Sequence, residues 1–215
     1  MLFLTSASTP ETRAAWADGR LGCLLLPDHG KRLKQLEPVS VWAADNGCYA
    51  KGERFDMGIY LDWLAALTPH RARCLFATAP DVVGDAAATW ARSAPTLPQI
   101  RALGYRAALV AQDGLDPATL AWDDFDALFV GGTTGYKLSA GAFALVREAK
   151  ARGKWTHMGR CNSLRRLRSA VLGGYDSADG TQLAYRPSET VPKLLGWMRY
   201  LREQQRLPLG GTEVA

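Results

Sequence analysis

Two aspartates lie three positions apart in GYDSADGT, residues 174–181. Small residues surround them, and the stretch ends a short apolar run. A carboxylate in such a place can organise a turn, or it can act as a nucleophile toward an electrophilic carbon. The absence of bulk around Asp179 would leave room for a substrate. The residues alone leave both interpretations open.

Further polar or small residues follow other apolar runs along the chain. They are Asp45, Asp81, Gln112, Gly131, Gly132, Met158 and Gly159. Three carboxylates, an amide and a double glycine could together form a pocket for a flat polar molecule, because glycines let backbone groups approach a ligand closely. Each also has a structural interpretation. Asp45 precedes the turn signal Asn-Gly, and Asp81 could cap a helix around 85–91.

Short apolar runs alternate with amphipathic segments. The runs span 2–6, 22–27, 40–45, 74–81, 107–112, 127–132, 154–159 and 174–179, and the clearest helical segments span 58–67, 140–153, 162–174 and 188–206. Runs this short and apolar suit strands that are covered on both faces. The pattern predicts a compact (β/α)8 barrel whose strand ends meet at one mouth. An open doubly wound sheet is the alternative, although no glycine-rich nucleotide motif follows the first run.

Length and composition set further limits. The chain has 215 residues, 47% hydrophobic, which favours one domain; we expect it to span 1–206, with a flexible tail at 207–215. Four scattered cysteines and three histidines form no metal motif, so we expect no metal and no cofactor. No signal peptide or membrane span is evident, which predicts a cytoplasmic protein with no membrane partner.

Four segments, in order, resemble motifs of the tRNA-guanine transglycosylases. DNGCY (45–49) is similar to their DSGGF/Y, VAQDG (110–114) to VQGG, and GGTTGYK (131–137) to GGLAVGE. The fourth segment, HMGRCNSLRRLRSAVLGGYDSADGT (157–181), resembles their LMGVG helix followed by GIDMFDC. The zinc-binding insertion of that family is absent here. The chain therefore looks more like the smaller phage and bacterial 7-deazaguanine transglycosylases, which act on DNA.

This resemblance implies a base exchange without a cofactor. Asp179 would be the nucleophile that expels guanine from DNA, and Asp45 would be the general acid and base. A free 7-deazaguanine such as preQ0 would then replace guanine, so the enzyme would be a pentosyltransferase. Asp176 would be structural.

The resemblance also implies a set of contacts to the base. Asp81 and Gln112 would read its edge, and Gly131 and Gly132 would add backbone donors. Tyr49 and Met158 would lie on either side of the ring. Lys137 replaces the family's glutamate, so we expect the incoming base to be neutral at that end, unless Lys137 is simply a solvent-facing lysine.

Arginines near the predicted nucleophile suggest contacts to a nucleic-acid backbone. Arg160, Arg165, Arg166 and Arg168 lie in GRCNSLRRLR, and the net charge is +5. An ordinary solvated helix face is the structural alternative. The functional alternatives are the same exchange on tRNA, a non-catalytic nucleic-acid-binding barrel subunit, and a different barrel enzyme such as a sugar hydrolase.

Overall fold

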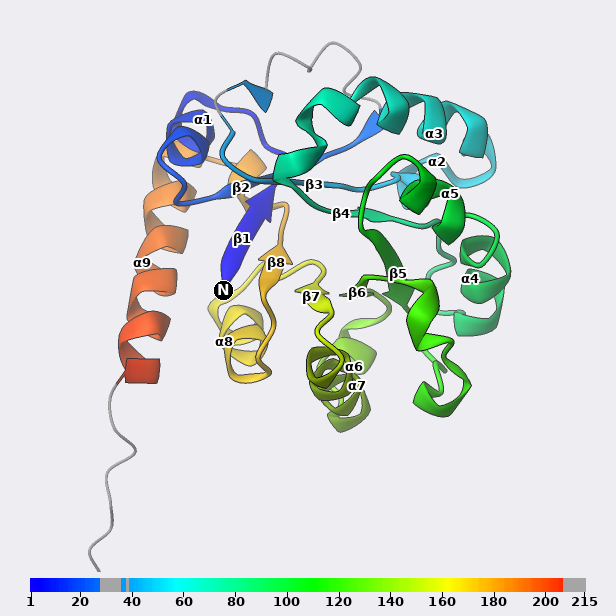
Figure 1. Ribbon diagram of the computed structural model, residues 1–215. Helices are drawn as coiled ribbons and strands as arrows, with labels where there is room; N and C mark the ends of the chain where they lie inside the picture. Colours follow the sequence, from blue (N-terminus) through cyan, green and yellow to red (C-terminus); the bar gives the residue numbers. More distant parts are fainter. Residues whose placement is uncertain (28–35, 38, 207–215) are drawn as a thin grey trace, which may run out of the picture.

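Eight parallel strands close into a barrel, which confirms the predicted fold class (Figure 1). The computed structural model describes residues 1–27, 36–37 and 39–206, so the predicted tail at 207–215 lies outside the described residues. The strands are β1 (Leu2–Thr5), β2 (Gly22–Leu25), β3 (Trp42–Ala44), β4 (Cys74–Thr78), β5 (Ala107–Ala111), β6 (Ala127–Val130), β7 (Trp155–Met158) and β8 (Ser177–Asp179).

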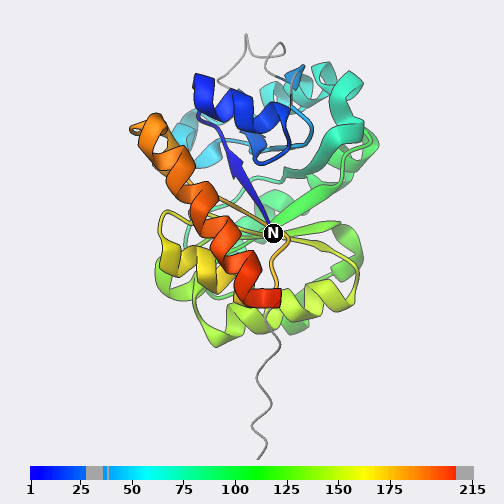
Figure 2. The ribbon, with the colours of Figure 1, turned by 90° about the vertical axis from the view of Figure 1, so that its left-hand side faces the viewer.

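Helices lie around the barrel. They are α1 (Pro10–Ala17), α2 (Cys48–Lys51), α3 (Met57–Ala66), α4 (Ala86–Ser93), α5 (Leu97–Ala102), α6 (Thr134–Lys137), α7 (Ala140–Ala151), α8 (Leu164–Leu172) and α9 (Pro187–Arg206). The connection from β5 to β6 holds only short 3-10 turns, Pro117–Thr119 and Trp122–Asp124. The long helix α9 runs across the side of the molecule on which the N-terminus lies (Figure 2).

The first and last strands join to close the barrel. Leu2 pairs with Ser177 and Leu4 pairs with Asp179 in parallel register. The backbone N–H of Leu2 also donates to the carbonyl of Asp176 at 2.9 Å. This register fixes the height of Asp179 relative to β1, so the first residues of the chain help to position a candidate catalytic side chain.

Successive side chains along each strand point alternately into the barrel and toward the helices, which gives two separate apolar clusters. Leu4, Leu24 and Phe76 belong to a cluster inside the barrel, where alanines of β3, β5 and β6 leave room for larger neighbours. Phe3 and Leu25 belong instead to the larger core beneath the helices. Because the interior is filled by side chains, substrate can enter only at an end of the barrel.

Helix caps decide which acidic residues remain for other roles. Asp56 caps α3 and Asp85 caps α4, each accepting a backbone N–H in the first turn. The structural interpretation of Asp81 as a cap of the 85–91 helix is therefore wrong, because Asp85 performs that role. Within the part of the chain that the structure describes, no helix is long and apolar enough to cross a membrane.

Candidate active site

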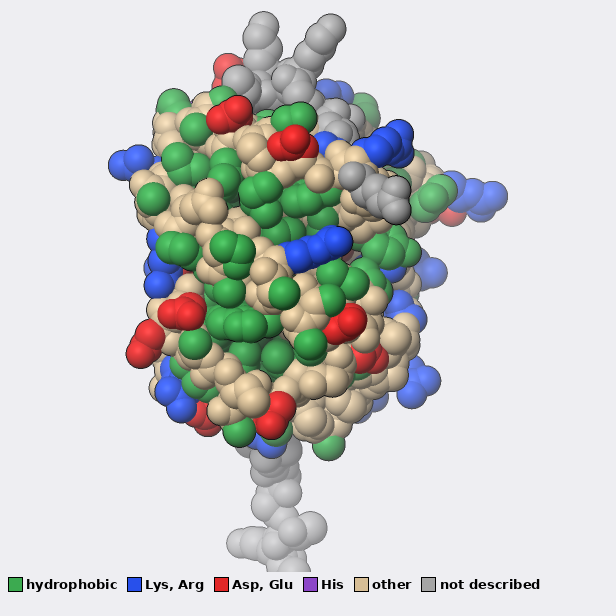
Figure 3. All heavy atoms as spheres, turned by 90° about the vertical axis from the view of Figure 1, so that its right-hand side faces the viewer, with side chains coloured by type: hydrophobic (Ala, Val, Ile, Leu, Met, Phe, Trp, Pro, Cys, Tyr) green, Lys and Arg blue, Asp and Glu red, His purple; other side chains and the backbone are tan. Residues whose placement is uncertain are grey.

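A cavity of about 110 Å³ lies at the carboxyl ends of the strands. Its lining includes the three aspartates and the amide that the sequence placed after separate strands, together with Tyr49, Lys137 and Arg160. The complete lining is Asp45, Asn46, Tyr49, Thr78, Asp81, Val83, Val110, Gln112, Phe129, Gly131, Gly132, Lys137, Gly159, Arg160 and Asp179. The small volume favours a small substrate, or a larger one whose remainder stays outside the mouth. Figure 3 shows the flank of the barrel that lies on the right in Figure 1, where apolar patches surround a basic side chain.

Asp45 follows β3 and has both of the roles considered from the sequence. Its Oδ1 accepts the backbone N–H of Gly47 at 2.9 Å, and Gly47 takes a φ of 71° in the turn. Burial raises the pKa of Asp45 to about 6, and the nearby carboxylates of Asp179 and Asp81 add to this rise. A carboxyl group with that pKa can both give and take a proton near neutral pH.

Asp81 is held by two side chains from other elements. Its Oδ2 accepts from Nε2 of Gln112 at 2.5 Å, and its Oδ1 accepts from the thiol of Cys48 at 3.0 Å. Gln112 is fixed in turn, because its Oε1 accepts the backbone N–H of Gly84. Burial raises the pKa of Asp81, although both hydrogen bonds oppose that rise. Gln112 therefore positions Asp81 as well as lining the cavity.

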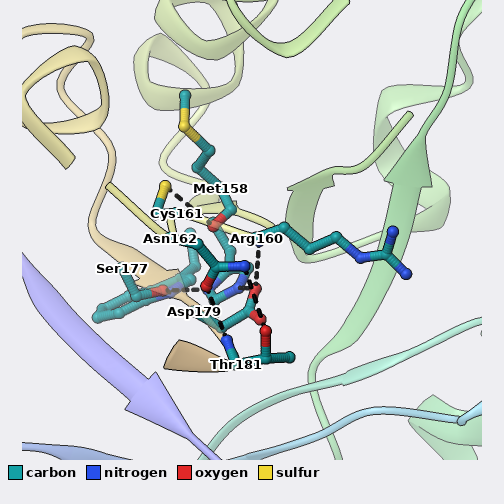
Figure 4. A network of polar contacts seen from close by, with 9 residues as sticks. Met158, Arg160, Cys161, Asn162, Ser177, Asp179 and Thr181 are labelled. Atoms are coloured by element: carbon teal, nitrogen blue, oxygen red, sulfur yellow. Dashed lines mark hydrogen bonds and ion pairs between the residues drawn. The ribbon is translucent and has the colours of Figure 1, made fainter. Parts of the chain in front are cut away.

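Asp179 ends a chain of hydrogen bonds that crosses from β7 to β8 (Figure 4). Its Oδ1 lies 3.1 Å from Nε2 of His157 and accepts the backbone N–H of Arg160 at 3.0 Å. In the neutral His157 tautomer with its proton on Nε2, this N–H donates to Asp179. The bare Nδ1 then accepts from the hydroxyl of Ser177, 2.8 Å away. Ser177 accepts from Nε1 of Trp155 at 2.9 Å. The direction of this chain fixes the carboxylate of Asp179.

Lys137 ends the short helix α6, which follows β6. The sequence left open a solvent-facing lysine, but the residue is only 5% exposed. Its ammonium has no hydrogen bond or ion pair with any described residue. Burial lowers the pKa of Lys137, and the positive charge of Arg160 lowers it further, against the opposing effect of Asp179. A buried lysine with a lowered pKa and no partner among the described residues is a nucleophile candidate.

Arg160 reaches across the mouth from the end of β7. Its φ is 60°, a left-handed conformation that is uncommon outside glycine. This conformation lets its backbone N–H bind Asp179 while its guanidinium lies 4.3 Å from the ring centroid of Tyr49, on α2. Figure 4 shows the Arg160 side chain extending away from Asp179. Its guanidinium has no ion pair within the described residues, so it can bind an anion.

The two glycines after β6 are required by close packing. A Cβ on Gly131 would come within 2.9 Å of Nε2 of Gln112 and of Cγ1 of Val110. Gly132 has a φ of 75°, a backbone conformation that residues other than glycine rarely adopt. Any larger residue at 131 would push Gln112 away from Asp81. The double glycine therefore keeps this wall of the cavity thin.

Met158 does not line the cavity, contrary to the expected stacking position. It is 1% exposed and belongs to the core beneath the helices. Figure 4 shows its side chain directed away from Asp179. Side chains alternate along β7, so placing Met158 outside the barrel places His157 inside.

Of the three arginines on α8, one makes hydrogen bonds close to the mouth of the cavity and two are exposed to solvent. Arg166 donates to the carbonyl of Arg160 at 3.1 Å and to Oγ1 of Thr134 at 3.1 Å, so it supports the mouth from behind. Arg165 and Arg168 are exposed and are not part of the cavity lining. The predicted contacts of these arginines with a nucleic-acid backbone stay predictions.

Sequence reasoning missed His157 and Asn46. Asn46 is buried, and its Nδ2 donates to Oγ1 of Thr78 and to the carbonyl of Ala79, which ties the β3 loop to β4. The alternation in WTHM could have indicated an inward His157, but a lone histidine in an apolar strand gave no chemical signal. Asp176, expected to be structural, accepts from the ammonium of Lys150 and from the backbone N–H of Thr156.

Among the described residues, no group of three or more histidine, cysteine or acidic side chains is arranged to hold a metal ion. The charged side chains that line the cavity are three carboxylates, one lysine and one arginine. These groups can transfer protons, attack a carbonyl carbon and bind an anion.

Comparisons with known proteins support the fold and give no family. No family model matches the chain, and no curated protein matches it. A solved structure described as "Native KDPGal structure" aligns with a TM-score of 0.57 and 12% identity, over 96% of each chain. That protein is an aldolase. At this identity the likeness shows a shared barrel fold alone.

The resemblance to tRNA-guanine transglycosylases is contradicted by these findings. No family model matches, and the structural likeness is to an aldolase. The predicted guanine exchange on DNA is therefore wrong, and neither the tRNA alternative nor the non-catalytic nucleic-acid-binding subunit is supported. The phage and preQ0 assignments have no support either. Short motifs of aspartate, glycine and small residues are what the mouths of unrelated barrels require, so their order along the chain was not specific.

We predict that Asp45→Asn stabilises the protein at neutral pH. The folded chain binds the Asp45 proton up to about pH 6, whereas the ordinary pKa is 3.8, so this group's contribution to stability falls as pH rises between these values. Asparagine can still accept the Gly47 N–H. Urea unfolding should show the variant more stable than the wild type above pH 6, by roughly 1–3 kcal/mol, and equal below about pH 4. A difference that does not change with pH would contradict the raised pKa of Asp45.

Proposed function

We propose that the protein is an enzyme that cleaves a small carbonyl compound through a Schiff base on Lys137, a lyase of the aldolase type. The observation that carries this proposal is the buried ammonium of Lys137, which has no hydrogen-bond or ion-pair partner among the described residues and lies in a cavity with three carboxylates. Burying a charge without a partner is costly, and the cost is reduced when the amine is neutral. A neutral amine is the form that attacks a carbonyl carbon.

The cavity supplies the proton transfers that this chemistry requires. Nζ of Lys137 adds to the carbonyl carbon, and the resulting carbinolamine loses water to give the Schiff base. A base removes the proton of a hydroxyl group on the carbon beyond the adjacent one, the bond between these two carbons breaks, an aldehyde leaves, and the electron pair moves to the iminium nitrogen to give an enamine. Protonation of the enamine and addition of water then release the second product and restore Lys137. Asp45, with a pKa near 6, can remove and return the protons of these steps. The aldolase with the same barrel fold is consistent with this reaction class.

Arg160 suggests that the substrate carries a negative charge. Its guanidinium lies at the mouth over Tyr49, and it has no carboxylate partner in the described chain. A guanidinium can bind a carboxylate or phosphate through two parallel hydrogen bonds. The arginine would orient the substrate while Lys137 reacts with its carbonyl group.

A second candidate, glycoside hydrolysis, is favoured by one observation. Asp45, with its raised pKa, faces Asp179 within one cavity. Glycosidases use two carboxyl groups whose environments hold them in different protonation states. Release of reducing sugar by the wild type, undiminished in Lys137→Met, would favour this candidate over the Schiff base.

Borohydride trapping tests the Schiff base directly. The protein is incubated with a panel of small 2-oxo acids and hydroxyketones, reduced with sodium borohydride, and analysed by intact mass and peptide mapping. We expect one adduct per chain, located on Lys137 and absent from Lys137→Met. The control Lys193→Met removes an exposed lysine of α9 and should trap normally. Failure to trap any carbonyl compound, or equal labelling of surface lysines, would contradict the proposal.

A second prediction concerns Arg160. For the carbonyl compound that traps best, Arg160→Met should raise the concentration needed for half-maximal trapping by roughly tenfold, because a charged hydrogen-bond donor is lost. Arg165→Met, an exposed arginine outside the cavity lining, serves as the matched control and should change little. Equal effects of the two substitutions would show that Arg160 has no specific role in binding the anion.

A further inference from the structure

A second hollow lies at the opposite end of the barrel from the candidate active site. It is lined by residues that precede or begin β3, β4 and β5, among them Arg71, Arg73, Gly104 and Arg106. Its volume is about 420 Å³. The candidate active site lies instead beyond the carboxyl ends of the strands, so the two hollows are separate.

Among the described residues, the lining of this hollow carries positive charges and no acidic side chain. Arg71, Arg73 and Arg106 line it, and no aspartate or glutamate belongs to the described lining. Other arginines of the chain have acidic partners, such as Arg101 with Asp126 at 2.7 Å. The guanidiniums of Arg71 and Arg106 have no hydrogen bond or ion pair with any described residue.

Packing holds two of these arginines in place. Arg73 donates to the carbonyl of Val39, and its Nη2 lies 3.0 Å from Nδ1 of His70. The carbonyl of His70 accepts from Nε1 of the buried Trp42 at 3.0 Å, which anchors this turn to β3. Arg71 lies over Gly104, whose φ is 83° and where a Cβ would come 3.3 Å from the arginine. The absence of a side chain at 104 therefore gives Arg71 its position.

We propose that this arginine groove, defined by Arg71, Arg73 and Arg106, binds the phosphate group of a small ligand. Guanidinium groups match the oxygen atoms of phosphate in pairs, and several of them around one hollow can share two phosphate charges. Three cations with no acidic residue in the described lining repel one another, and a bound phosphate relieves that repulsion. The groove is a second binding site, and it does not depend on the Schiff-base reaction.

Calorimetric titration of the full chain with inorganic pyrophosphate tests the groove. We expect saturable binding at low ionic strength that weakens as sodium chloride is added. Arg71→Ala combined with Arg106→Ala should weaken binding roughly tenfold or more, since two charged donors are removed. Arg71→Lys combined with Arg106→Lys keeps the charge but loses the paired geometry, and should give an intermediate affinity.

The control is Arg92→Ala combined with Arg147→Ala, which removes the same charge from exposed positions on α4 and α7. It should bind pyrophosphate within about twofold of the wild type, because it leaves the groove intact. Absence of binding to the wild type at millimolar pyrophosphate would overturn the proposal. So would equal losses in the two alanine pairs, wild-type affinity in the lysine pair, or binding that disappears with Arg160→Met instead. An unchanged melting temperature in each variant verifies that the fold is intact.

Discussion

Closure of the parallel barrel is the constraint on which the rest of the structure depends. The pairing of β1 with β8 completes the ring and brings the ends of all eight strands to one mouth. Asp45, Asp81 and Asp179 are far apart in the sequence, and they share a cavity only because the ring closes. Burial at this mouth raises the pKa of Asp45 and lowers that of Lys137. The architecture of the backbone thus determines the chemistry of its side chains.

The candidate site combines rigid and unpaired groups. Asp179 and Asp81 are each held by hydrogen bonds from neighbouring elements. Lys137 and the guanidinium of Arg160 have no such partners in the described chain. Fixed acceptors beside unpaired cations are a preorganised environment for a substrate that carries both a carbonyl group and a negative charge. The strained backbone of Arg160 serves this arrangement, because one residue supports Asp179 and also spans the mouth.

Sequence patterns predicted the barrel well and its chemistry poorly. Apolar runs and helical periodicity located the strands and the helices α3, α7, α8 and α9, because burial on both faces leaves a strong signal. The polar residues Asp45, Asp81, Gln112 and Asp179, which follow separate strands, also line one cavity as expected. Met158 was misplaced because strand alternation was not applied to β7, and His157 was missed for the same reason. The burial of Lys137 could not be read from its neighbours, since it depends on how α6 folds over the mouth. Motif order suggested a transglycosylase, and the comparisons contradict it.

The electrostatic state of Lys137 is the feature that most directly decides the proposed chemistry. Reductive methylation with ¹³C-formaldehyde, followed by NMR titration of the dimethylamino signals, reports the pKa of each lysine, and Lys137→Met assigns the signal of interest. A pKa clearly below the ordinary lysine value of about 10.4 is the predicted result. A Lys137 signal that titrates at or above that value would contradict the Schiff-base proposal, because the amine would then remain charged in the cavity.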